Sequence, residues 1–203
     1  MIFEYETVFL GLFFGCLVVL EGVYFHLVVW IIFSIFAEEL LLCMSMEDNR
    51  YVLGIDPGLS GGLVLLGMDG DVVDVCRMPS TPYDILCCLR GYVSLGHVVC
   101  YMEKVGTGMP GQSSKATATF ARHNGHLEMA LLSLGVRTSE VTPAKWMKSF
   151  QLGRSSDYGK VEWKNRLKSC AQQLFPSEKV TLCVSDALLI AEYGRRCELS
   201  SSV

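Results

Sequence analysis

Three acidic residues stand where a carboxylate could act on a phosphate group. Asp56 ends the apolar run YVLGI just before Pro-Gly, and Glu103 ends the apolar run HVVCYM. Asp186 opens the helix-like segment DALLIAEYGRR. Carboxylates that share a poorly solvated site repel one another unless a cation lies between them. Because oxygen ligands suit Mg²⁺ or Mn²⁺, these three residues are candidate metal ligands and candidate catalytic residues.

Each acid also has a simpler explanation that the sequence leaves open. Asp56 could be an ordinary turn aspartate, Glu103 a surface charge at a strand end, and Asp186 a helix N-cap. Their joint placement favours a shared site over three separate coincidences. Two metal ions about 4 Å apart in such a site can clamp a phosphodiester for hydrolysis.

The elements that would position these acids alternate between strands and helices. Three short strands follow one another from residue 51, with Asp69-Gly70 as a hairpin turn between the second and third. Residues 97–103 and 136–141 predict two further strands, the first of them buried on both faces. Segments whose apolar residues recur at helical spacing lie between these strands and after the last of them. This order predicts an α/β fold with an RNase H-like mixed sheet, a three-strand meander plus two further strands, flanked by helices.

The front of the chain differs from the rest in composition. Residues 8–36 are almost wholly apolar, and the first basic residue is Arg50. We expect two parts: an apolar N-terminal helical extension, 1–45, and an RNase H-like nuclease domain, 46–203. The extension is either a membrane helix or an upstream segment without a part in the chemistry, and Met44 or Met46 could start a complete domain.

Charge and cysteine usage bear on partners and location. Residues 104–179 carry twelve Lys or Arg against five acids, which suggests either a surface that faces a polyanion or an ordinary solvated helix face. The nine cysteines include no C-x-x-C motif, which is typical of a reduced intracellular protein and not of a disulfide framework. We expect a cytoplasmic protein of phage or bacterial type, with a membrane tether through residues 8–36 as the alternative.

A set of motifs resembles the RuvC-like Holliday junction resolvases, in their phage-type and organellar branch. The motifs are GIDPGLSGG, an apolar strand ending in Glu, MPGQ, VTPxxW, QLFP and DALLIAEYGRR, in that order over residues 51–196. The resemblance implies a homodimeric Mg²⁺-dependent endonuclease, with Mn²⁺ as a substitute, that resolves four-way DNA junctions in recombination and repair. It also matches Asp56, Glu103 and Asp186 to the metal-binding acids.

The expected DNA-binding face combines a loop and several helices. The loop after Glu103 would bring backbone amides and polar side chains close to phosphates. The candidate DNA-binding residues are Gln112, Ser113, Ser114, Lys115, Arg122, Lys145, Lys148, Lys164 and Lys168. His123 and His126 are interpreted as surface helix residues, and Trp146, Phe150 and Trp163 as packing in the core or a dimer seam.

One departure from the family pattern leaves the activity open. The best-known bacterial members carry two acids on the last helix, yet residues 181–185 contain no carboxylate or imidazole. The alternative function is therefore a catalytically weakened or inactive junction-DNA-binding module of the same fold. Two other classes are less consistent with the sequence: a sugar-kinase or actin-type ATPase, which needs a second phosphate loop, and a membrane protein whose soluble domain serves only for interaction.

Overall fold

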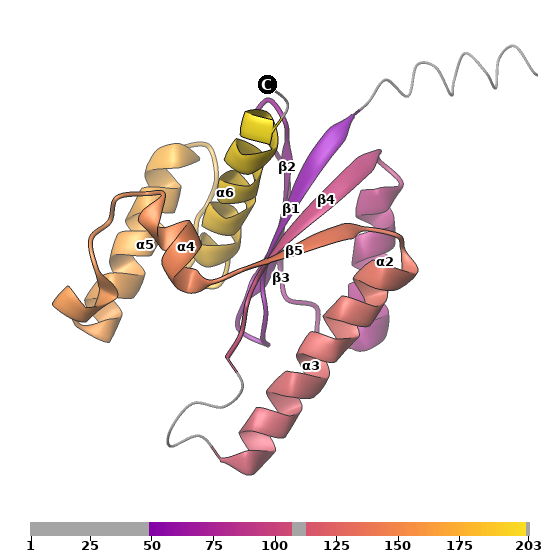
Figure 1. Cartoon of the computed structure of the whole chain (residues 1–203), viewed down its shortest axis with the longest axis horizontal. Coiled ribbons are helices and arrows are strands. Elements are labelled where there is room, and N and C mark those ends of the chain that lie inside the picture. The colour runs from indigo at the N-terminus through magenta and orange to yellow at the C-terminus, as the bar shows by residue number, and fades with distance from the viewer. Residues whose placement is uncertain (1–48, 107–112, 202–203) are drawn as a thin grey trace, which may run out of the picture. The chain divides into compact units, whose positions relative to one another are not determined.

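The computed structural model describes residues 49–106 and 113–201, all of which belong to one compact unit (Figure 1). Within them, one mixed sheet contains β1 (Arg50–Asp56), β2 (Gly62–Gly67), β3 (Val72–Arg77), β4 (His97–Glu103) and β5 (Arg137–Val141). The strands lie in the order β3-β2-β1-β4-β5. The first three pair antiparallel, while β4 is parallel to β1 and β5 is parallel to β4. This topology confirms the predicted RNase H-like sheet.

Helices cover both faces of the sheet. They are α2 (Pro82–Val93), α3 (Ser114–Ser133), α4 (Pro143–Lys148), α5 (Lys160–Leu174) and α6 (Ser185–Ser201), with a short 3₁₀ turn at Ser155–Asp157. Figure 1 shows α2 and α3 on one face and α4, α5 and α6 on the other. The chain therefore forms three layers, with β1 and β4 at the centre of the middle one.

Local sequence explains how several elements begin and turn. Gly70 has φ +99° in the tight connection between β2 and β3, a conformation that favours glycine. The hydroxyl of Thr81 accepts a hydrogen bond from the backbone amide of Asp84 at 3.1 Å, which caps α2. Thr142 precedes α4 as expected, but its side chain makes no capping hydrogen bond, so Pro143 at the first helical position supplies the start signal.

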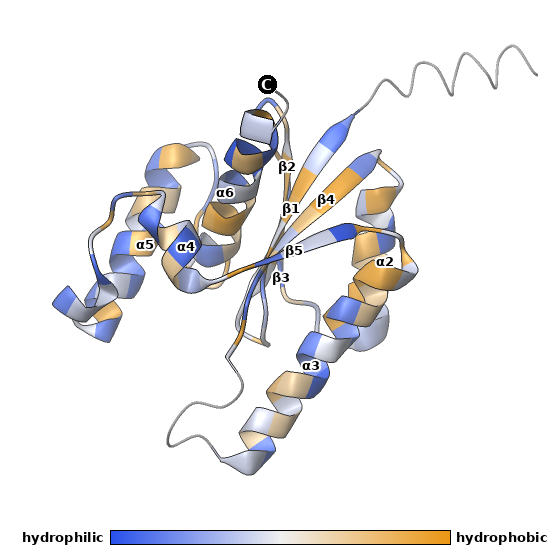
Figure 2. Cartoon of the chain, in the orientation of Figure 1, coloured by the Kyte–Doolittle hydropathy of each residue, from blue (hydrophilic) through white to orange (hydrophobic). Residues whose placement is uncertain are grey.

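The core consists of two apolar clusters on opposite faces of the sheet. Val52, Val99 and Tyr101 face α6, whereas Leu53 and Met102 face α2 and α3. This alternation follows from the two-residue period of a strand. Figure 2 shows the central parts of β1 and β4 as apolar. Both central strands are therefore buried on their two faces, as the continuous apolar runs predict.

Glycine at position 54 allows α6 to lie unusually close to β1. A Cβ atom at Gly54 would lie 2.3 Å from the carbonyl oxygen of Ala187 and 2.4 Å from the backbone nitrogen of Ala191. Such separations are far inside van der Waals contact, so no larger residue fits without a shift of the helix. The first turn of α6 is therefore placed directly against the last half of β1.

Several expectations about the front of the chain concern residues that the structure does not describe. The apolar extension 1–45 and its candidate membrane helix 8–36 lie outside the described residues. Within 49–106 and 113–201, no helix has the length and apolar character needed to cross a membrane. All the cysteines in those two ranges are free. The domain boundary at 45/46 stays a prediction.

Candidate active site

The pairing of β1 with β4 brings Asp56 and Glu103 to the same edge of the sheet. The parallel register pairs Ile55 with Met102, so the next residue of each strand is an acid. Side chains alternate along a strand, and Val52 and Tyr101, an even number of residues earlier, face α6. Asp56 and Glu103 therefore lie beside each other on the face that α6 covers.

Asp186 reaches the same edge from the start of α6. It lies one residue before Ala187, whose carbonyl oxygen packs against Gly54 of β1. The residue is 4% exposed. Its negative charge acts on both Asp56 and Glu103. The fold thus brings the three acids, from two strands and one helix, into one cluster, here called the acid cluster.

Burial and mutual repulsion make this cluster difficult to ionise. Burial, followed by the charges of Asp186 and Glu103, raises the pKa of Asp56 to about 7. Burial also raises the pKa of Glu103, with a further contribution from Asp186. A carboxylate with a pKa near neutrality is typical of functional sites, because purely structural acids usually gain partners that lower it.

Lys164 on α5 supplies the positive charge nearest to the acid cluster. Its Nζ atom donates to Asp186 Oδ2 at 2.5 Å. Burial acts to lower the pKa of the Lys164 ammonium, but the charges of Asp186, Asp56 and Glu103 outweigh it and the pKa is raised. The ammonium group therefore serves as the counter-ion of all three acids, which differs from the simple phosphate contact expected from the sequence.

Trp146 on α4 holds the second acid in place. Its indole Nε1 donates to Glu103 Oε2 at 2.9 Å. The Trp146 side chain is fully buried, as the core interpretation predicted. A hydrogen bond to the charged form opposes the rise in the pKa of Glu103. The tryptophan thus combines core packing with orientation of a candidate ligand.

The acid cluster has the ligand types of a cation site, but its side chains are not arranged around one point. Among the described residues, no group of three or more His, Cys, Asp or Glu side chains is placed so that it could hold a metal ion. One oxygen of Asp186 binds Lys164, and one oxygen of Glu103 binds Trp146. The all-oxygen donors, the excess of negative charge and the ammonium already bound do fit a hard divalent cation.

The segment before Asp186 offers no carboxylate or imidazole as a replacement ligand. Leu182 in that segment is 49% exposed and apolar. The buried hydroxyl of Ser185 donates to Asp186 Oδ1 at 3.2 Å. Ser185 therefore contacts Asp186 but adds no negative charge.

The other candidate DNA-binding residues fall on three separate helices. Ser113 caps α3, accepting from the backbone amide of Ala116 at 3.2 Å, and Ser114, Lys115 and Arg122 are exposed on that helix. Lys145 and Lys148 are exposed on α4, and Lys168 is half-buried on α5. Gln112 lies outside the described residues. Contact with DNA stays a prediction for all of them.

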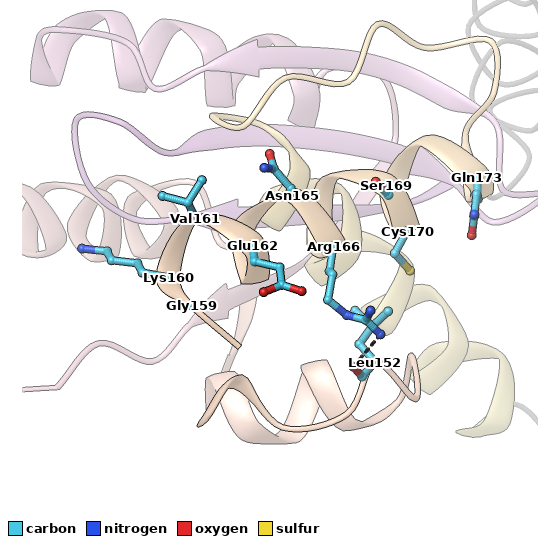
Figure 3. A pocket seen from close by; sticks show the side chains of 10 residues that line it. All are labelled: Leu152, Gly159, Lys160, Val161, Glu162, Asn165, Arg166, Ser169, Cys170 and Gln173. Carbon is cyan, nitrogen blue, oxygen red and sulfur yellow. Dashed lines mark hydrogen bonds between the residues drawn. The ribbon is translucent and has the colours of Figure 1, made fainter. Parts of the chain in front are cut away.

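A hollow of about 870 Å³ lies along the outer side of α5, and none of the three acids lines it (Figure 3). There the guanidinium of Arg166 donates to the carbonyl of Leu152 at 3.2 Å. It also lies 4.4 Å from the centre of the Tyr158 ring, which stacks on Trp163 at 5.8 Å. These contacts hold the loop after α4 against α5 and have a structural role.

Comparisons with known proteins give a likeness in structure alone. No family model matches the chain, and no curated protein sequence matches it. The solved structures similar to it include two of RuvC. The structure of Thermus thermophilus RuvC has a TM-score of 0.49 and 16% identity, and the match covers 74% of this chain and 96% of that one.

The second structure is T. thermophilus RuvC in complex with a Holliday junction substrate. Its TM-score is 0.49 at 14% identity, and the match covers 74% of this chain and 97% of that one. With identity this low, function has to be argued from the residues of the site.

Two residues that contact the acid cluster have roles that the sequence did not indicate. Lys164 was a candidate for DNA contact and Trp146 for core packing, and neither was linked to an acid. Trp146 belongs to the VTPxxW motif, whereas Lys164 belongs to none of the motifs. The acids that they contact lie 43 and 22 residues away in the sequence.

Proposed function

We propose that this protein is a metal-dependent endonuclease that cuts branched DNA, with the four-way junction as its substrate. The observation that carries the proposal is the acid cluster, in which Asp186 pairs with the Lys164 ammonium and the charges of Asp56 and Glu103 also act on that ammonium. A cluster of this kind is costly to keep ionised. The repulsion among these acids at the edge of the central strands is relieved if cations bind there, and the cations would in turn bind phosphates.

Asp56, Glu103 and Asp186 would hold the cation. A divalent ion, once bound, supplies charge stabilisation for a phosphoryl group and lowers the pKa of a water molecule. The protein's own contribution is to keep Trp146 on Glu103 and to release Lys164 from Asp186, since the ammonium and a metal ion compete for the same oxygen. Lys164 would then be free to contact a phosphate, as the sequence suggested.

Basic side chains near the cluster support the DNA part of the proposal. Lys115 lines the same hollow as Pro57, the residue after Asp56. Lys145 and Lys148 lie on α4, the helix that also carries Trp146. Their charges would bind the phosphates on either side of the cut. Contacts of this type place DNA without selecting its sequence.

A homodimer is part of the proposal, because symmetrical cutting of two strands needs two sites. Met129 and Leu132 are apolar and 62% and 72% exposed on α3. A second copy of the chain that covered them would bury this apolar surface. Sedimentation of the full chain should therefore show a dimer that Leu132→Glu weakens.

A cleavage assay tests the proposal directly. The full chain is incubated with a labelled synthetic four-way junction and, separately, with linear duplex of the same sequence, in 10 mM Mg²⁺ or Mn²⁺. We expect nicks in the junction only, and their loss in Asp56→Asn. Asp71→Asn, which changes an exposed aspartate in the β2–β3 hairpin, is the matched control. A protein that binds the junction but never nicks it in either metal contradicts the proposal.

The second candidate is a junction-binding module without nuclease activity. The lack of a carboxylate or imidazole in residues 181–185 favours it, and Leu182 in that segment is exposed and apolar. This candidate predicts equal junction affinity for the wild type and Asp56→Asn, no cutting, and no effect of Mg²⁺ on thermal stability.

A further inference from the structure

A second hollow, of about 640 Å³, begins one residue beyond the acid cluster. It lies between the turn that follows β1 and the first half of α3. The side chains that matter for its chemistry are Leu59, Ser60, Lys115, Thr119, Phe120 and His123. Because Pro57 also lines it, anything that occupies this hollow lies next to a substrate held at Asp56.

His123 is the unusual member of this lining. The residue is only 8% exposed, although the sequence suggested a surface position. Among the described residues, its Nε2 atom has no hydrogen-bond partner and is shielded from water. A buried polar atom without a partner destabilises the folded state. Such atoms are rare in folded proteins and call for a specific explanation.

The imidazole of His123 is suited to contact with an uncharged group. Burial, together with the nearby His126, lowers its pKa. It is therefore neutral at physiological pH, with one nitrogen that donates and one that accepts. A phosphate would favour a charged imidazole, whereas the edge of a nucleobase offers neutral donors and acceptors.

The remaining walls fit a flat, partly apolar ligand with a nearby negative charge. Gly58 has φ +111°, and a Cβ there would lie 3.2 Å from the Phe120 ring, so glycine lets the turn close on this ring. Leu59 is 68% exposed beside the hollow. Lys115 and the Thr119 hydroxyl add polar groups. Aromatic and apolar walls with a cation at the rim are typical of sites that bind single nucleotides of DNA.

We propose that this hollow receives one base of the bound DNA beside the scissile phosphodiester, and that His123 contacts the edge of that base through Nε2. His123 is then a specificity-determining residue. The contact requires the imidazole to turn toward the hollow that it lines, because Nε2 is shielded in the structure. This inference rests on the proposed function, since it takes junction DNA as the ligand.

The test measures base preference by binding, so that it does not depend on cleavage. The full chain is mixed in EDTA with four-way junctions randomised at the base pairs around the branch point, and the bound fraction is sequenced. For the wild type, we expect about tenfold enrichment of one base at one position, the value of one good hydrogen bond. In His123→Ala the enrichment at that position should disappear.

Matched variants separate a base contact from a general loss of structure. His126→Ala changes the neighbouring imidazole on the same helix and should keep the wild-type preference. His123→Gln places a side-chain amide near the position of Nε2 and should keep a preference, for the same base or a different one. Because His123 is neutral, His123→Ala should leave the salt dependence of binding unchanged, whereas Lys115→Ala should reduce its slope.

The outcomes distinguish this inference from the proposed function. Wild-type preference that persists in His123→Ala overturns the role of His123. A wild type that binds junctions without preference overturns the hollow as a base site and leaves the nuclease proposal standing. A preference that depends on His123 in a protein that never cuts supports the hollow and overturns the nuclease. A wild type that does not bind junctions overturns both.

Discussion

Replacement of Asp56 by asparagine is expected to stabilise the metal-free protein above neutral pH. The pKa of Asp56 is about 7 in the folded protein, against 3.8 for an ordinary aspartate. At about 1.36 kcal/mol per pKa unit, the ionised carboxylate costs the folded state roughly 4 kcal/mol well above pH 7. Asparagine has nearly the same shape and no charge, so it avoids most of this cost.

The direction of the pH dependence follows from proton binding. Between pH 4 and pH 7 the folded protein keeps a proton on Asp56 that the unfolded chain has lost. The stability that this carboxyl contributes is therefore complete below pH 3.8 and is lost as the pH rises through about 7. About 2–3 kcal/mol of the loss falls between pH 5 and pH 8.5. Asp56→Asn should lack this part of the decline.

Urea denaturation of the full chain in EDTA, at pH 5 and pH 8.5, measures the effect. The Asp56→Asn variant should exceed the wild type by a few kcal/mol at pH 8.5 and by less at pH 5. Asp71→Asn is the control and should follow the wild type at both values. The reasoning is refuted if Asp56→Asn is less stable than the wild type at pH 8.5, or if both proteins show the same decline.

Three further substitutions probe the parts that position the acids. Gly54→Ala should lower the free energy of unfolding by about 1–3 kcal/mol, because the new Cβ would lie 2.3 Å from the Ala187 carbonyl oxygen; an unchanged denaturation midpoint contradicts this. Trp146→Phe removes the hydrogen bond to Glu103 and should raise the pKa of that carboxyl, measured by NMR titration of its carbon. Lys164→Met should destabilise the metal-free protein by about 1–2 kcal/mol at pH 8.5, and 10 mM Mg²⁺ should restore most of the loss. A loss that Mg²⁺ does not reverse argues against cation binding.

Much of the sheet could be predicted from the pattern of apolar residues. The runs before Asp56 and Glu103 are short, continuous and ended by an acid, which indicates strands at the centre of a sheet. The Asp69-Gly70 turn and the order of the elements then predict the meander. Once β1 and β4 are parallel neighbours, Asp56 and Glu103 must end at the same edge. The proximity of Asp56 and Glu103 therefore follows from the order of the strands and from the two-residue alternation of side chains along them.

The partners of the acids could not be predicted in this way. Lys164 reaches Asp186 because α5 packs on α6, and Trp146 reaches Glu103 because α4 docks at the end of β4. His123 is buried on α3, where it lines the hollow beside the turn after β1. Periodicity shows which side of an element faces inward, but it does not show which side chain of another element it will meet.

The amino-acid sequence is therefore sufficient for the strands, their order along the chain and the acids at their ends, since these depend on local patterns of residues. Three features depend on contacts between residues far apart in sequence: the ion pair of Lys164 with Asp186, the hydrogen bond of Trp146 to Glu103, and the hollow that His123 lines. Such contacts arise from the close approach of whole elements, as at Gly54, where a missing side chain sets the position of a helix.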